Sequence, residues 1–178
     1  MMLWGVLCAD AETSGGVPHD AAPLRDALEG LVVVPRHAPA QRSAVHRGAA
    51  VAGLRTELVA GLLEVPPEAE LVALIDVAAI APDSTDLVVR MRARLTDGTA
   101  AVVRGGPVTD ALKRVDGARV LDGVDRSGLF VPQTPQILRR AALEDAVVRG
   151  PAHLTDPATL LAACGYRVDV LWGGAGES

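Results

Sequence analysis

Five short apolar segments recur along the chain, and each predicts a buried β-strand. They are almost continuously apolar rather than alternating with polar residues, which is typical of strands covered on both faces. A sheet built from them has to lie between two layers of helices. The segments are residues 3–9, 31–35, 71–78, 99–105 and 166–173.

Helical patterns lie between these segments. Ser84 or Thr85 is a candidate N-cap for one helix, and Pro135 suits the first turn of another. The last helix has Thr155 or Asp156 as its candidate N-cap. The predicted helices cover residues 23–30, 55–65, 84–95, 135–150 and 155–165. This alternation predicts a layered α/β domain with a mainly parallel sheet, in which ligands bind at the carboxyl ends of the strands.

The segment of residues 108–126 departs from this alternation and predicts a β-hairpin. Two short β-like pieces flank Asp116 and Gly117, a dipeptide that favours tight hairpin turns. An isolated hairpin is only marginally stable in water, so its apolar side chains need a surface to pack on. A partner chain is the expected surface.

The composition narrows the class of protein. A chain of 178 residues suits one domain, and with 49% hydrophobic but 2% aromatic residues its core must consist of Ala, Val and Leu. The net charge of −5 argues against general nucleic-acid binding but leaves room for a small phosphorylated ligand. No apolar stretch approaches the roughly 18 residues of a membrane span, and no signal peptide is evident. We therefore expect a cytoplasmic protein that binds neither nucleic acid nor membrane.

Several other chemistries lack their sequence signatures. Cys8 and Cys164 lie far apart, and the four histidines are scattered, so no zinc spacing is present. The sequence also contains no nucleophile elbow, no Walker loop and no dinucleotide-binding glycine fingerprint.

Three ordered blocks in the second half of the chain carry a family resemblance: PVTDALK at residues 107–113, VDRSGLFVPQTPQ at 124–136 and LTDPATLLAACGYRVDVLWG at 154–173. They resemble blocks of the 2-C-methyl-D-erythritol 4-phosphate cytidylyltransferases of the non-mevalonate isoprenoid pathway. The resemblance implies one domain over residues 1–178 with a three-layer, Rossmann-like nucleotidyltransferase fold and a protruding β-arm at about 108–126. It also implies a homodimer whose subunits exchange this arm.

The resemblance further implies a reaction and a set of site residues. In that family CTP and a magnesium ion bind above a glycine-rich loop, and the substrate phosphate attacks the α-phosphorus and releases pyrophosphate. Such catalysis depends on positioning and on charge stabilisation by cations. By resemblance, Arg126 contacts the polyol phosphate across the dimer, and Asp76 is also a candidate metal ligand. The implied substrate-binding residues are Asp76, Arg126, Thr134 and Thr155.

Two of these residues also have structural interpretations. Asp76 follows a predicted strand, so its carboxylate can cap the next helical turn instead of binding a metal. Arg126 can pair with Asp125 or bind the arm itself. For residues 133–136 we expect a turn into the next helix, with the amide side chains satisfying backbone groups.

The sequence departs from the family pattern where the family binds CTP. After the first predicted strand it has Gly15 and Gly16 but no Lys or Arg before Arg25. Asp10 and Glu12 add negative charge there instead. A carboxylate about 4 Å from a phosphate charge costs about 1 to 4 kcal/mol in water-rich surroundings. The loop is therefore predicted to bind a triphosphate poorly.

Other family positions are also replaced. Ala79 stands where the family has a substrate-binding arginine, and Ala111 stands where it has threonine. Residues 173–178, GGAGES, do not supply the second catalytic lysine of the family.

Three hypotheses about function follow. The first is a degenerate homologue, inactive or altered in activity, that binds a phosphorylated ligand or a partner. The second is an active nucleotidyltransferase that uses CTP and magnesium in a rebuilt site containing Asp76, Arg126 and Arg25. The third is a regulatory subunit that pairs with an intact paralogue.

Overall fold

The computed structural model describes residues 1–10, 19–36, 61–151, 153–154 and 156–172. Every structural statement below concerns this part of the chain. Thr155, the glycine-containing segment of residues 11–18 and residues 173–178 lie outside it.

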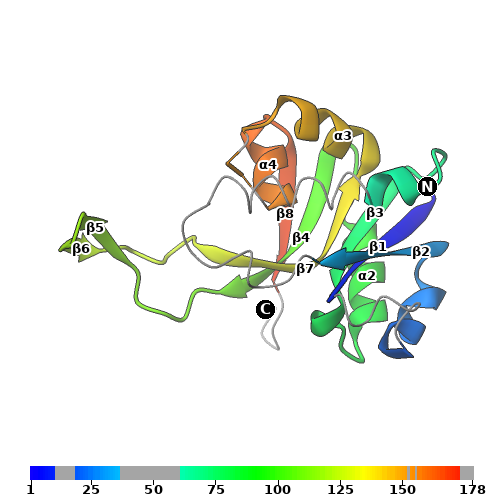
Figure 1. Ribbon diagram of the computed structural model, residues 1–178, viewed down its shortest axis with the longest axis horizontal. Coiled ribbons are helices and arrows are strands. Elements are labelled where there is room, and N and C mark those ends of the chain that lie inside the picture. Colours follow the sequence, from blue (N-terminus) through cyan, green and yellow to red (C-terminus); the bar gives the residue numbers. More distant parts are fainter. Residues whose placement is uncertain (11–18, 37–60, 152, 155, 173–178) are drawn as a thin grey trace.

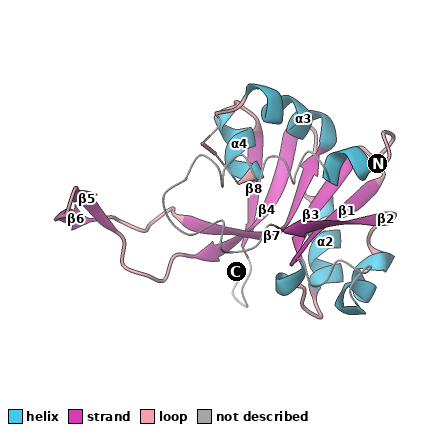
Figure 2. Cartoon of the chain, in the orientation of Figure 1, coloured by secondary structure: helices cyan, strands magenta, loops and turns pink. Residues whose placement is uncertain are grey.

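A six-stranded mixed sheet forms the centre of the molecule, with strand order β2-β1-β3-β7-β4-β8 (Figure 2). β1 runs parallel to β2 and β3, and β4 runs parallel to β8. β7 is antiparallel to both of its neighbours, β3 and β4. The strands are β1 (Leu3–Asp10), β2 (Gly30–Arg36), β3 (Leu71–Asp76), β4 (Thr99–Pro107), β7 (Phe130–Arg139) and β8 (Arg167–Trp172).

Helices cover both faces of this sheet and complete the predicted three layers, as Figure 1 shows. The 3-10 helix η2 (His19–Asp26) and α2 (Ser84–Ala93) pack on one face, and α3 (Arg140–Arg149) and α4 (Pro157–Ala163) pack on the other. Because side chains alternate along a strand, β3 contributes side chains to the core on both faces of the sheet. Leu71 and Ile75 join the core beneath α2, whereas Val72 and Leu74 join the core beneath α3 and α4.

The predicted helix at residues 135–150 is wrong in its first part, because Pro135 to Arg139 belong to β7 and α3 begins only at Arg140. Ile137 and Leu138 are both fully buried, and they face opposite core layers. Adjacent residues with opposite orientations fit a strand between two helical layers, not the one-sided burial of a surface helix. The turn expected at residues 133–136 is wrong for the same reason.

Other predicted boundaries shift by smaller amounts. The helix expected at residues 23–30 is η2, which lies earlier in the chain. The N-cap position of α2 is Asp83, and Ser84 instead accepts a hydrogen bond at Oγ from the Ala81 N–H at 2.8 Å. Asp156 is confirmed as the N-cap of α4, because its carboxylate accepts a hydrogen bond from the Thr159 N–H.

The predicted β-arm protrudes far from the main sheet (Figure 1). Its two strands, β5 (Lys113–Asp116) and β6 (Arg119–Gly123), form a separate antiparallel sheet. Gly117 adopts a φ of 55° in the turn between them, where glycine is favoured. Every residue of both strands is exposed, including Val115 and Val120, so the arm buries no apolar side chain against its own chain.

Within the described residues, no helix is long and apolar enough to cross a lipid bilayer.

Candidate functional site

Ligands of open α/β sheets bind at the edge where the parallel strands end. Here that edge contains the carboxyl ends of β1, β2, β3, β4 and β8, together with the amino-terminal half of the antiparallel β7. It is also the edge from which the chain leaves β4 for the arm and returns to β7. Asp76, Thr134 and Arg104 lie along this edge on three neighbouring strands.

The structure brings two of the predicted site residues together. The backbone N–H of Asp76 donates a hydrogen bond to Thr134 Oγ1 at 3.2 Å, although the two residues lie 58 positions apart in the sequence. The bond joins the end of β3 to β7, and it leaves the threonine hydroxyl proton available to another acceptor.

The Asp76 carboxylate caps a helical turn. Its Oδ1 accepts a hydrogen bond from the Ala78 N–H at 3.0 Å, at the start of the 3-10 helix η4 (Val77–Ala79). This confirms the structural interpretation of Asp76. Ala79, which replaces the substrate-binding arginine of the resembled family, is exposed in the same turn and brings no charge.

The described residues offer few ligands for a magnesium ion at this edge. Among the described residues, no three His, Cys, Asp or Glu side chains cluster as a metal site would require. Magnesium in nucleotide enzymes is often bound by one or two carboxylates plus substrate phosphates, so Asp76 fits such an ion only as a single ligand.

Gln136 and Asp156 connect β7 to α4 beside this edge. Gln136 is 5% exposed, and its Nε2 donates to Asp156 Oδ1 at 2.7 Å. The other carboxylate oxygen, Oδ2, accepts from the backbone N–H and the hydroxyl of Thr159, each at 2.8 Å. The Oε1 atom of Gln136 is buried and has no hydrogen-bond partner in the described part of the chain. The predicted site residue Thr155 immediately precedes Asp156 but lies outside the described residues.

Arg126 lies apart from Asp76 and Thr134, on the segment that returns from the arm. Its Nη1 donates to the backbone carbonyl of Val108 at 3.2 Å and to those of Thr109 and Asp110. Arg126 therefore joins the two sides of the arm's base, which is one of its two predicted structural roles. Its other predicted partner, Asp125, instead accepts a hydrogen bond from the Ser127 N–H, which lowers the pKa of that carboxyl.

Arg104 is a cation that the sequence motifs did not reveal. It lies in β4, opposite Gln133 of β7 and Leu171 of β8, and it is half-buried. Its Nε is buried without a hydrogen-bond partner among the described residues. The arginine predicted for a rebuilt site, Arg25, is instead exposed in the last turn of η2.

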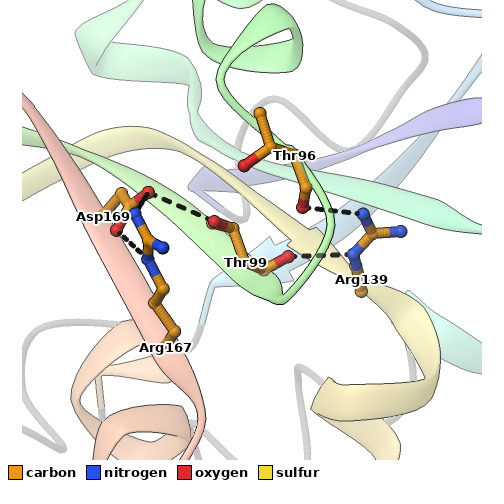
Figure 3. A network of polar contacts seen from close by, with 5 residues as sticks. All are labelled: Thr96, Thr99, Arg139, Arg167 and Asp169. Atoms are coloured by element: carbon orange, nitrogen blue, oxygen red, sulfur yellow. Dashed lines mark hydrogen bonds and ion pairs between the residues drawn. The ribbon is translucent and has the colours of Figure 1, made fainter.

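A second polar network lies at the opposite edge of the sheet (Figure 3). Thr99 Oγ1 donates to Asp169 Oδ2 at 3.2 Å, and Arg167 forms hydrogen bonds to both oxygens of the same carboxylate. Arg139 donates to the carbonyls of Thr99 and Thr96 at 2.8 and 3.2 Å. The Arg167 hydrogen bonds lower the pKa of Asp169. These contacts join the starts of β4 and β8 to the end of β7, so they are structural.

Comparison with known proteins gives the family. Residues 36–177 match the family model "IspD: 2-C-methyl-D-erythritol 4-phosphate cytidylyltransferase". The chain is 40% identical over 155 residues to the "Bifunctional enzyme IspD/IspF" of Clavibacter michiganensis, a match that covers 86% of this chain and 38% of that one. The chain thus spans well under half the length of this curated relative.

Solved structures show the same fold. The 2-C-methyl-D-erythritol 4-phosphate cytidylyltransferase of Thermus thermophilus has a TM-score of 0.62 at 25% identity, covering 96% of this chain and 88% of that one. The 4-diphosphocytidyl-2C-methyl-D-erythritol synthase of Anaerococcus prevotii has a TM-score of 0.69 at 16% identity, covering 98% and 88%. With its three sequence blocks, its mixed sheet and its protruding arm, the chain belongs to the 2-C-methyl-D-erythritol 4-phosphate cytidylyltransferase family.

Proposed function

We propose that this chain is an altered cytidylyltransferase homologue that retains the polyol-phosphate half of the site and has lost most of the CTP half. The observation that carries this proposal is the hydrogen bond from Asp76 N–H to Thr134 Oγ1, which holds two family substrate-binding positions side by side. A polyol phosphate presents hydroxyl groups and a phosphate, and the Thr134 hydroxyl can donate to either.

The loss of the CTP half is supported by charge. Asp10 ends β1, and β1 is paired with β3, which ends in Asp76. The chain thus carries a carboxylate residue at the ends of two adjacent strands, next to the segment where the family places its triphosphate-binding loop. Residues 11–18 supply no lysine or arginine to offset them, and the strand register places one arginine, Arg36 of β2, beside Asp10. Phosphoryl transfer depends on cations that neutralise the developing charge, so we expect slow cytidylyl transfer or none.

The arm supports the proposal that two copies of this chain form a homodimer. Val115 and Val120 face each other in the hairpin register, and both are more than half exposed. A two-stranded hairpin of this size is marginal alone, so contact with a second copy would stabilise it. Arg126 is bonded to the base of the arm and would move with it toward the partner's site.

Calorimetric titration of the purified chain tests the functional proposal. Methylerythritol phosphate is expected to bind with a dissociation constant in the micromolar to low millimolar range, and CTP with magnesium at least tenfold more weakly. Binding of CTP at tens of micromolar, with pyrophosphate release when both substrates are present, would show that the CTP half is intact. If neither compound binds at millimolar concentration, the proposal fails as a whole.

An active cytidylyltransferase with a rebuilt nucleotide site is the second candidate. It is favoured by the 40% identity to a bifunctional IspD/IspF enzyme and by the presence of the half-buried cation Arg104 near the site edge. The pyrophosphate-release measurement decides between the two candidates.

A further inference from the structure

Arg104 is in an unfavourable environment for a charged side chain. It interrupts a strand whose preceding residues, Ala101 to Val103, are fully buried. The described part of the chain provides its guanidinium with no carboxylate, and its buried Nε lacks even a neutral acceptor. Burying a hydrogen-bond donor without an acceptor destabilises a fold, and buried cations are normally paired. The described part of the fold therefore gives no structural reason for an arginine at this position.

The strand register places Arg104 beside the candidate site. Gln136 pairs with Leu74 on one side and with Val103 on the other, so these three residues form one row across β3, β7 and β4. Arg104 lies one residue beyond this row and Asp76 two residues beyond it, both toward the carboxyl-end edge. With β7 between their strands, the two backbones are about 10 Å apart, because neighbouring strands are about 4.8 Å apart.

The side chain of Arg104 lies on the face of the sheet that α2 covers. β4 stays in register with β8 through Val103, Arg104 and Gly105, so the alternation of its side chains continues. Val102, two residues earlier, packs in the core beneath α2, and Leu171, opposite Arg104 in β8, packs in the same core. The chain that leaves Asp76 through η4 forms α2 on this face. Arg104 and the turn capped by Asp76 thus border the same end of the sheet.

We infer that Arg104 is an anion-binding residue of the candidate site, whose guanidinium binds a phosphoryl group of the substrate. A guanidinium offers five donors in a planar fork that matches two phosphate oxygens, and it keeps its charge when partly buried. Arg104 supplies positive charge at an edge where Ala79 supplies none. This inference rests on the proposed function, because it assumes a phosphorylated ligand, and it adds a residue to that function.

Binding measurements on matched variants test the inference. Pyrophosphate, methylerythritol phosphate and CTP with magnesium are titrated into the wild type and into Arg104→Leu, Arg104→Gln and Arg149→Gln. Arg149→Gln removes the same charge from the exposed end of α3, where Arg149 pairs with Asp145, and it serves as the control. We expect Arg104→Leu and Arg104→Gln to lower the affinity for at least one of the three ligands tenfold or more. The affinities of Arg149→Gln should stay within twofold of the wild type. If methylerythritol phosphate loses affinity, Arg104 binds the phosphoryl group of the polyol. If CTP loses affinity, Arg104 binds a phosphoryl group of the nucleotide.

The melting temperature separates binding from a structural role. If Arg104 is retained for binding, Arg104→Leu should melt at the same temperature as the wild type or higher, because the substitution replaces an unpaired buried donor with hydrocarbon. Should the leucine variant not fold, Arg104→Gln carries the test. Affinities equal to the wild type in the folded variants would overturn the inference, and so would a wild type that binds none of the three ligands. A wild type that binds pyrophosphate through Arg104 but binds neither substrate would leave the inference standing and remove the proposed function.

Discussion

Gln136 of β7 and Asp156, the N-cap of α4, are joined by a 2.7 Å hydrogen bond from Nε2 to Oδ1. This bond connects the strand that carries Thr134 to the helix that follows the Thr155 position. It also gives the second oxygen of the capping carboxylate a hydrogen-bond donor, because the first oxygen is already bound to Thr159.

Removing either partner of this bond should destabilise the protein to different extents. Gln136→Leu removes one hydrogen bond to a partly exposed carboxylate, and we expect it to cost about 1 kcal/mol of unfolding free energy. Asp156→Ala also removes the helix cap and leaves the buried Gln136 amide unpaired, so we expect about 2 to 3 kcal/mol. Urea denaturation of both variants measures the difference. Equal losses would show that the cap and the unpaired amide add nothing beyond the Gln136–Asp156 hydrogen bond itself.

Thr134→Val should weaken ligand binding more than folding. The substitution removes the hydroxyl that accepts the Asp76 N–H, which we expect to cost about 1 kcal/mol of stability. It also removes the donor proposed for the polyol phosphate, so we expect the affinity for methylerythritol phosphate to fall roughly tenfold, which corresponds to about 1.4 kcal/mol.

The matched control for this prediction is Thr134→Ser, which keeps the hydroxyl. It should retain affinity within about threefold of the wild type, a difference of under 1 kcal/mol. A valine variant that binds as well as the serine variant would exclude Thr134 from the site.

Protonation of Asp145 at low pH should lower the stability of the folded protein. Hydrogen bonds from Arg149 and from the Tyr166 hydroxyl lower the pKa of Asp145 from 3.8 to about 2. Because the pKa is lower in the folded state than in the unfolded chain, the stabilisation is fully present above about pH 4 and is lost as the pH falls toward 2.

Denaturant unfolding of the wild type and Asp145→Asn at pH 6, 3 and 2 measures this contribution. The two proteins should differ most at pH 6 and converge at pH 2. Tyr166→Phe is the second comparison, because it removes one of the two donors and should narrow the pH range of the effect. A difference between wild type and Asp145→Asn that stays constant across the range would contradict the linkage.

The exposed valines of the arm should determine the oligomeric state. Val120→Asp places a charge on the face that Val115 and Val120 share, so we expect it to convert a homodimer to a monomer without lowering the helical content. Light scattering after size exclusion measures the mass, and circular dichroism monitors the fold. Val148→Asp, on α3, is the control, because Val148 is 84% exposed outside the arm. A wild type that is monomeric at tens of micromolar would refute the dimer.

Local signals were sufficient to predict much of the fold. Asp156 and Pro157 indicate the start of α4, and Asp116 with Gly117 indicates the hairpin turn, because caps and tight turns depend on a few adjacent residues. The apolar runs likewise predicted five of the strands, since strands buried on both faces are apolar throughout.

The failures concern interactions between distant residues. Pro135 suits both the first turn of a helix and the interior of β7, and only pairing with β3 and β4, each encoded far upstream, decides between them. The Asp76–Thr134 contact spans 58 residues and has no local pattern. The sequence pattern places Arg104 in an apolar strand, because nothing adjacent in the sequence reveals that its buried Nε lacks a partner among the described residues.

β7 begins at the root of the arm with Phe130, passes Thr134, where its register with β4 shifts, and ends at Arg139 at the opposite edge of the sheet, in register with Leu71. It therefore connects the proposed subunit contact to the candidate site and, through Ile137 and Leu138, to the two core layers. If the arms of two copies engage, dimer formation and ligand binding both act on the conformation of β7. By linkage, each of the two binding events then changes the affinity of the other by the same factor. A ligand that tightens the dimer by some factor must itself bind the dimer more tightly by that factor, so its apparent affinity will depend on protein concentration.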